Sequence, residues 1–237
     1  MLKVYTILCR AGKMDNYSYL IIDEESGKSA IIDPSEAAPV IKKCDELGIK
    51  PDYIFNTHHH FDHTDANLDI KQRYAAKVVA NINDAARIPG FDIGVEPGKT
   101  FSLGQSTAEI IDVSAHTQGH ILWYFPKDKI VFTGDTLFNL CIGGLFEGSV
   151  EEMYEALKKI KQLPDDVVFY PGHEYTLHSI PMALHLLPHS EKLRQYVQNA
   201  QQKLAQGLPV SPIPLGIEKE CNPYLQADSR AELEKLF

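Results

Sequence analysis

The sequence has few cysteines and no long apolar run. Its four cysteines lie far apart in the chain, with no C-x-x-C pair among Cys9, Cys44, Cys141 and Cys221. This spacing suggests neither a disulfide framework nor a thiolate zinc site, and it is typical of a reducing compartment. No run is long enough to span a bilayer, and the first residues lack the apolar segment of a signal peptide. We therefore expect a cytoplasmic protein that does not enter membranes.

Positive charge is also scarce. The chain has 23 Lys and Arg against 32 Asp and Glu, a formal net charge of −9 over 237 residues. Such a charge repels nucleic acid and anionic lipid surfaces, so neither is an expected partner. The composition, 44% hydrophobic and 23% charged, is typical of a globular enzyme. We expect a small-molecule ligand and a monomer or weak homo-oligomer.

Short β-type runs dominate the chain up to residue 172. We predict strands at 2–8, 18–23, 28–33, 53–56, 77–80, 107–113, 121–125, 129–132 and 167–170. Helical periodicity occurs in the segment from Pro34 to Gly48 and at 65–74 and 150–162. Beyond Pro171-Gly172 the pattern turns helical, at 177–187 and 191–204, with a proline-rich connector at 209–214. The expected organisation is an α+β domain over 1–172 and a helical region over 173–237.

The most informative segment follows the strand at 53–56. There, two imidazoles and an Asp-His pair fall at positions i, i+2, i+4 and i+5, namely His58, His60, Asp62 and His63. Imidazole and carboxylate groups suit zinc, iron or manganese, and this grouping can serve two ions. Each ion needs at least three protein ligands, so further His and Asp residues are expected at other strand ends.

Three such residues are present downstream. His116, Asp135 and His173 each follow a β-type run, and Gly119, Gly134 and Gly172 stand near them. We predict two divalent metal ions, with zinc expected and iron or manganese as alternatives. One ion is assigned to His58, His60 and His116, and the other to Asp62, His63 and His173, with Asp135 as the bridge. We interpret His59, His178, His185 and His189 as ordinary histidines, and His120 as structural or as a support to the ligands.

The order H-x-H-x-D-H, His116, Asp135 and His173 resembles the metallo-β-lactamase superfamily over residues 1 to about 173. Within it, the chain is similar to glyoxalase II, on longer matches at residues 57–64, 134–138, 146–148 and 171–176. The resemblance implies an αββα sandwich with the metals at one edge, in which 1–172 is the catalytic domain and 173–237 a substrate-binding region.

The resemblance also implies a reaction. This is hydrolysis of S-D-lactoylglutathione to D-lactate and glutathione by attack of a metal-bound hydroxide, which Asp62 and Asp135 position. It implies substrate contacts from Tyr175 and from the positions of Gly144 and Phe146. The chain departs from the family at Gly144, where a basic residue is usual. Family members also continue past a segment like Asn222-Pro223-Tyr224 into a helix bearing Arg and Lys, so we expect a weaker preference for glutathione here.

Other activities remain open from sequence. The same fold supports a mononuclear iron persulfide dioxygenase, and it supports hydrolases of lactones, β-lactams or non-glutathione thioesters. A metal-stabilised binding module without turnover is a candidate from a different class. We interpret Arg230 and Lys235 as solvated helix charges rather than substitutes for the family's basic helix.

Overall fold

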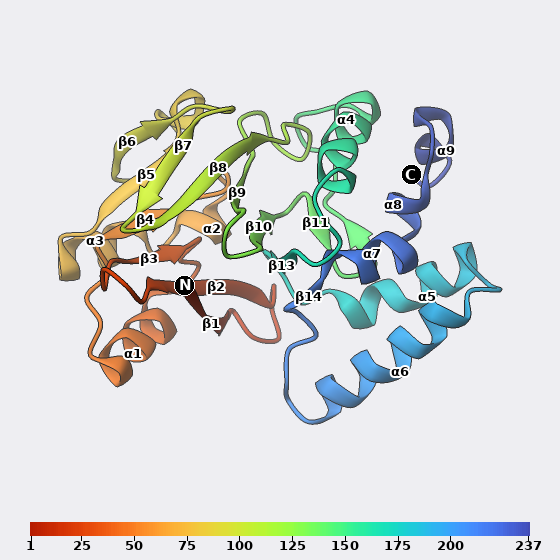
Figure 1. Cartoon of the computed structure of the whole chain (residues 1–237), viewed down its shortest axis with the longest axis horizontal. Coiled ribbons are helices and arrows are strands. Elements are labelled where there is room, and N and C mark those ends of the chain that lie inside the picture. Colours follow the sequence, from red (N-terminus) through yellow and green to blue (C-terminus); the bar gives the residue numbers. More distant parts are fainter.

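The computed structural model describes residues 1–237 and contains two six-stranded sheets flanked by helices (Figure 1). The first sheet has the order β1-β2-β3-β4-β5-β6. Its strands are β1 (Leu2–Cys9), β2 (Asn16–Asp23), β3 (Ser29–Ile32), β4 (Tyr53–Phe55), β5 (Lys77–Asn81) and β6 (Phe91–Val95). The first three strands pair antiparallel, as the short turns between them require, and β3 to β6 pair in parallel.

The second sheet has the order β14-β13-β10-β9-β8-β7. Its strands are β7 (Thr100–Leu103), β8 (Ser106–Asp112), β9 (Ile121–Phe125), β10 (Ile130–Gly134), β13 (Val168–Pro171) and β14 (Ile213–Pro214), and a separate hairpin is formed by β11 (Leu137–Phe138) and β12 (Cys141–Ile142). The hairpin follows β10 directly, so it lies at the edge where that strand ends.

The helices are distributed over both outer faces and the C-terminal part. They are α1 (Ala37–Leu47), α2 (Phe61–Thr64), α3 (Asn67–Tyr74), the 3-10 turn η1 (Ile82–Asp84), α4 (Val150–Lys161), α5 (Thr176–Leu186), α6 (Glu191–Ala205), α7 (Leu215–Cys221), α8 (Pro223–Gln226) and α9 (Arg230–Glu234). A capping box between Ser149 and Glu152 starts α4, and Gly48 in the left-handed region (φ +66°) ends α1.

The buried apolar side chains form separate clusters, one between the two sheets and one between each sheet and the helices that cover it. Side chains of both sheets, including Phe55 and Trp123, whose rings stack at 4.3 Å, fill the space between the sheets. A second cluster joins the first sheet to α1 and α3, and a third joins the second sheet to α4 and the C-terminal helices. This arrangement confirms the predicted α+β class and the αββα sandwich.

The structure also contains elements that the sequence analysis did not predict. Strand β6 was missed because Gly94 stands within it, and strand β7 was missed because it is short and has only two apolar residues, Phe101 and Leu103. The prediction of a proline-rich connector at 209–214 was wrong in part, because Ile213 pairs with Phe169 and adds β14 to the second sheet. The short helices α7 to α9 follow it. No helix combines the length and the apolar character needed to cross a membrane.

Candidate active site

All seven predicted metal ligands meet at one edge of the sandwich. The segment carrying His58, His60, Asp62 and His63 follows β4, while His116 follows β8, Asp135 follows β10 and His173 follows β13. These strands belong to two different sheets, so the site exists only when the sheets are packed face to face. Their donor atoms fall into two adjoining groups, each with all donor atoms within 4.8 Å of one another.

The first group contains three histidines. His60 Nδ1 lies 3.1 Å from His58 Nε2 and 3.0 Å from His116 Nε2. In the second group, His173 Nε2 lies 3.2 Å from His63 Nε2 and 3.3 Å from Asp62 Oδ2.

Asp135 lies between the two groups. Its Oδ2 is 3.5 Å from His116 Nε2 and 3.2 Å from His173 Nε2, and its Oδ1 is 3.2 Å from His63 Nε2. Oδ1 is buried, and its geometry to His63 makes no hydrogen bond. A buried carboxylate that faces three imidazole nitrogens and keeps one oxygen without a hydrogen-bond partner fits a cation-binding position.

In four of the histidines, Nδ1 points away from the centre of the cluster and has an oxygen partner. His116 Nδ1 lies 2.7 Å from the Gly144 carbonyl oxygen, and His173 Nδ1 lies 2.7 Å from that of Met14. Because these carbonyls only accept, each Nδ1 carries a hydrogen, and each Nε2 faces the centre as the atom that can bind a cation. Wherever two unprotonated nitrogens face one another at about 3 Å, their lone pairs repel, and a cation between them removes that repulsion.

The other two outward nitrogens converge on Asp33, a residue that the sequence analysis missed. His63 Nδ1 lies 3.1 Å from Asp33 Oδ2, and His58 Nδ1 lies 3.0 Å from Thr57 Oγ1, which itself donates to Asp33 Oδ2 at 2.6 Å. The Thr57 amide donates to Asp33 Oδ1. Asp33 follows β3, and because β3 and β4 are parallel neighbours, their carboxyl ends lie side by side.

Asn16 is a second residue that the sequence analysis missed. At the start of β2, its side-chain amide donates to Asp62 Oδ2 at 2.9 Å and to the Asp62 carbonyl at 3.1 Å. It also forms a β-bridge with His173. Asn16 therefore orients the one carboxylate of the second group.

His120 lies beside the seven clustered side chains and contacts two of them, in line with its predicted role as a support to the ligands. Its ring is buried and stacked on His58 at 4.6 Å, and its Nε2 accepts a hydrogen bond from the Asp135 amide at 3.1 Å. His59 points away from the centre, toward Asp84 and Glu147 at 3.6 and 3.5 Å.

The protonation states suit metal ligands. Burial, with a contribution from His116, lowers the pKa of His60 to about 4, so its lone pair is free at neutral pH. Burial alone would raise the pKa of Asp135, but His63 and His173 hold it well below its usual value. Burial would lower the pKa of His173, yet Asp135 and Asp62 raise it to about 9. A cation bound to His173 therefore replaces a proton, as is usual for metal sites.

Two glycines allow the close approach of the segments. At Gly134 the backbone has φ +49°, and a Cβ there would lie 2.5 Å from Thr57 Oγ1. At Gly172 a Cβ would lie 2.2 Å from Asp135 Oδ1. Any side chain at Gly172 would therefore displace the central carboxylate.

A hollow of about 390 Å³ lies above the ligand cluster, and we name it the active-site hollow. Its lining is Met14, His60, Phe61, Asp62, His116, Asp135, Phe138, Ile142, Gly143, Gly144, Phe146, His173 and Tyr175. Tyr175 stacks on His173 at 4.6 Å, and Phe146, 72% exposed, stands edge-on to His60 and His116 at 5.4 and 5.1 Å. The three positions predicted to contact substrate therefore line this hollow, which contains no Lys or Arg.

The wall that carries Phe146 is held by an ion pair. Glu147 accepts hydrogen bonds from Arg87 at 2.6 Å and from the Gln118 amide at 2.7 Å. Arg87 also binds the buried carboxylate of Asp84. The Phe146-Glu147-Gly148 segment is thereby fastened to the loop that carries His116.

The comparisons with known proteins agree along the whole chain. Residues 11–173 match the family model of the metallo-beta-lactamase superfamily, and residues 174–236 match that of the hydroxyacylglutathione hydrolase C-terminus. The hydroxyacylglutathione hydrolase of Ruegeria pomeroyi is 40% identical over 226 residues, which cover 95% of this chain and 88% of that protein. The protein of that name from Pelagibacter ubique is 40% identical over 222 residues, covering 94% and 93%.

Solved structures show the same fold at lower identity. ETHE1 from Myxococcus xanthus superimposes with a TM-score of 0.73 and 24% identity, covering 98% of this chain and 88% of that one. A metallo-beta-lactamase from Staphylococcus aureus gives a TM-score of 0.76 and 20% identity, covering 100% and 66%. The chain therefore belongs to the metallo-beta-lactamase superfamily and, within it, to the hydroxyacylglutathione hydrolase family.

Proposed function

We propose that this chain hydrolyses the thioester bond of 2-hydroxyacylglutathiones such as S-D-lactoylglutathione, releasing a 2-hydroxy acid and glutathione. The observation that carries the proposal is the cluster of five imidazoles and two carboxylates, of which three imidazoles and both carboxylates line the active-site hollow. Curated relatives at 40% identity, which carry the name hydroxyacylglutathione hydrolase, support the choice of substrate.

The proposed cofactor is a pair of divalent metal ions. The donor set, with imidazole nitrogens oriented inward by outward hydrogen bonds, suits zinc, with iron or manganese as alternatives. One ion would be held by His58, His60 and His116, the other by Asp62, His63 and His173, and Asp135 would serve both. When bound, such ions lower the pKa of a coordinated water and polarise the thioester carbonyl.

The chain's own groups bind and orient the reactants. Asp62 and Asp135 line the hollow, and their carboxylates can accept a hydrogen from the attacking water and so fix its direction. Phe138 and Tyr175 form a wall with rings 5.3 Å apart, against which the apolar part of the thioester can lie. Phe146 covers the opposite rim. We place the substrate between these walls, with residues from 173 onward contributing Tyr175.

The proposal is tested by measuring hydrolysis of S-D-lactoylglutathione and of a non-glutathione thioester in parallel, with and without chelator. We expect chelator-sensitive hydrolysis of lactoylglutathione that returns when metal is added back. Metal analysis of the same preparation identifies the ions and their number per chain. Hydrolysis that resists a chelator in a preparation free of metal would contradict the proposal.

Two histidine variants provide a matched pair. His63→Ala removes a buried ring that faces Asp135, whereas His185→Ala removes an exposed ring on α5. The first should lose at least a hundredfold in kcat and lose bound metal, and the second should retain both. Oxygen uptake with glutathione persulfide at one iron per chain would instead support the dioxygenase alternative.

A further inference from the structure

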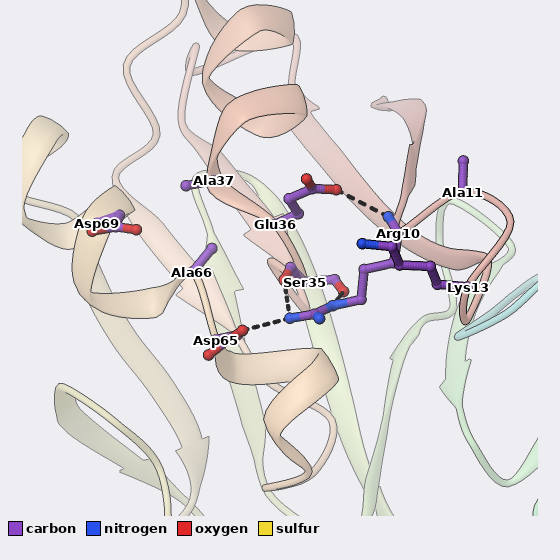
Figure 2. A pocket seen from close by; sticks show the side chains of 9 residues that line it. All are labelled: Arg10, Ala11, Lys13, Ser35, Glu36, Ala37, Asp65, Ala66 and Asp69. Atoms are coloured by element: carbon purple, nitrogen blue, oxygen red, sulfur yellow. Dashed lines mark hydrogen bonds and ion pairs between the residues drawn. The ribbon is translucent and has the colours of Figure 1, made fainter.

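Figure 2 shows a hollow of about 510 Å³ that three segments line: the β1–β2 loop, the residues that lead into α1, and the segment from the end of α2 into α3. The side chain of Arg10, in the loop, joins all three. Its Nε donates to the Ser35 hydroxyl at 2.9 Å and its Nη2 to the Ser35 carbonyl at 3.0 Å. Nη2 also pairs with the carboxylate of Asp65, which directly follows α2. A guanidinium suits such a junction, because its donors form a rigid fork in one plane.

The contacts of Arg10 reach a segment that carries proposed metal ligands. Phe61 and Asp65 stand at the two ends of the segment 61–65, which contains two ligands of the second group. Arg10 contacts both residues, since its guanidinium also lies 5.4 Å from the centre of the Phe61 ring. Only 21% of the Arg10 side chain is exposed, so these contacts are partly shielded from water and are stronger than on an open surface. Arg10 therefore ties the β1–β2 loop to the ligand-bearing segment.

The backbone of Arg10 also shapes the β1–β2 loop. Its carbonyl oxygen accepts hydrogen bonds from the amides of Lys13, Met14 and Asp15, at 3.0, 3.1 and 3.2 Å. Arg10 itself has φ +50°, a left-handed conformation that costs free energy for most residues other than glycine. Such a conformation persists where neighbouring contacts hold it, and here the side-chain bonds of Arg10 supply those contacts.

The loop that Arg10 shapes supplies outer partners to the second group of ligands. The Met14 carbonyl accepts the hydrogen bond of His173 Nδ1 at 2.7 Å. At the end of the loop, the Asn16 amide donates to Asp62 Oδ2 at 2.9 Å. A shift of this loop would therefore change the orientation of both ligands.

The first group of ligands depends on other contacts. Asp33 reaches it through Thr57, and the backbone of Asp33 is held by the Ser18 hydroxyl at 2.6 Å and by the Phe55 carbonyl at 3.0 Å. His116 takes its outer partner from the segment after β12. All of these contacts persist when the Arg10 side chain is removed.

We propose that Arg10 is a positioning residue for one of the two proposed metal ions, the ion assigned to Asp62, His63 and His173, an inference that rests on the proposed function. Arg10 donates to none of these ligands. It holds the loop that orients His173 and Asp62 against the segment that carries Asp62 and His63. Because an ion binds more tightly when outer partners fix its ligands beforehand, loss of this link weakens the binding of this ion and spares the other.

The first test titrates the metal-free protein with zinc in competition with a chromogenic chelator. Arg10→Asn removes the guanidinium and keeps a residue type that tolerates the left-handed conformation. We expect the affinity for one ion to fall about tenfold, the lower end of what outer partners contribute, and the affinity for the other to change by less than about twofold. Arg10→Lys keeps a charge for Asp65 but lacks the fork that binds Ser35, so its effect should be smaller. This milder variant carries the test if Arg10→Asn does not fold.

The control is Arg73→Asn. Arg73 likewise pairs with a carboxylate, that of Asp45, and lies 5.3 Å from the centre of an aromatic ring, that of Tyr74. These contacts join α3 to α1 and involve neither the β1–β2 loop nor the segment 61–65. Both zinc affinities should therefore stay within about twofold of wild type.

Two further backgrounds identify the ion on which Arg10 acts. His116→Ala removes a proposed ligand of the first group, and His173→Ala removes one of the second. Arg10→Asn should weaken the ion that remains in His116→Ala by about tenfold. It should change the ion that remains in His173→Ala by less than about twofold, because the two changes then affect the same site. A general loss of stability would weaken the remaining ion in both backgrounds.

The outcomes separate this inference from the proposed function. If wild type binds two ions and Arg10→Asn keeps both affinities, the role of Arg10 is overturned while the hydrolase proposal stands. Equal weakening of both ions, or a larger effect in His173→Ala than in His116→Ala, would also overturn it. If wild type binds fewer than two ions, or cleaves no glutathione thioester, the proposed function fails first.

Discussion

The Asp33 carboxylate lies 3.1 Å from Nδ1 of His63, on the side of the ring that faces away from the other predicted ligands. The same carboxylate accepts from Thr57, whose hydroxyl lies beside His58. The buried carboxylate of Asp33, at the end of β3, thus orients one proposed ligand of each ion: His63 directly and His58 through Thr57.

Replacing Asp33 with Asn should therefore weaken metal binding rather than abolish the fold. The amide cannot accept from Thr57 and His63 with the strength of a carboxylate, and outer partners of this kind are worth about 10- to 100-fold in metal affinity. Competition against a chromogenic chelator measures the change. Asp23→Asn is the control, since Asp23 is equally buried but accepts from Ser26 and Gln105, away from the metal site. Unchanged affinity in Asp33→Asn would exclude this role.

Metal removal should lower thermal stability by a measurable amount. A ligand at about 1,000 times its Kd stabilises a protein by about 4 kcal/mol, which for a chain of this size is a Tm shift of about 8–16 °C. Differential scanning fluorimetry with and without chelator tests this. In Asp135→Ala, which lacks the carboxylate between the groups, the chelator-induced shift should shrink. The same full shift in that variant would mean that Asp135 binds no ion.

Phe146 should contribute to substrate binding more than to folding, because it is 72% exposed. Its edge contacts with His60 and His116 place it on the rim, where it can cover a bound thioester. Phe146→Ala should raise KM by roughly three- to tenfold at nearly constant Tm, since burying part of an aromatic ring contributes about 1 kcal/mol. Phe237→Ala, another exposed phenylalanine, is the comparison. A fall in Tm with unchanged KM would contradict the assignment.

The sequence predicted well which seven side chains lie together, because each of them comes after an apolar strand. The runs before His58 and before Asp135 are short and consist of aromatic and β-branched residues, and the strand ends could be located within one or two residues. The αββα sandwich followed from the family resemblance and not from periodicity.

The supporting residues could not be predicted in the same way. Asp33 has the same signal as the ligands, an acidic residue after the apolar run at 29–32, but its partners depend on β3 lying next to β4. The pairing of Arg87 with Glu147 joins residues 60 positions apart and has no local pattern. Such contacts depend on which strands and loops are neighbours in space, and the spacing of residues along one sequence does not predict this.

A buried carboxylate in the C-terminal region gives a prediction about pH. Glu218 on α7 is fully buried, and it accepts hydrogen bonds from the Leu140 amide and the Tyr196 hydroxyl. Through Leu140 it fastens the β11–β12 hairpin, which carries the Phe138 wall of the active-site hollow. Burial raises the pKa of Glu218 to about 7, although these hydrogen bonds oppose the shift.

The sign of the pH effect follows from the raised pKa. The folded protein keeps a proton on Glu218 where the unfolded chain, with a carboxyl pKa near 4.5, has lost it. The stability from this group is therefore full below about pH 4.5 and is lost as pH rises to about 7, by up to about 1.4 kcal/mol per pH unit. Glu218→Gln cannot titrate, so the free energy of unfolding of wild type relative to this variant should fall between pH 5 and 7.5 and then level off. Urea unfolding of both proteins at these pH values measures it, and because the metal ligands are common to both, their titration cancels in the difference. A difference that stays constant over this range would mean that Glu218 is already ionised in the fold at pH 5.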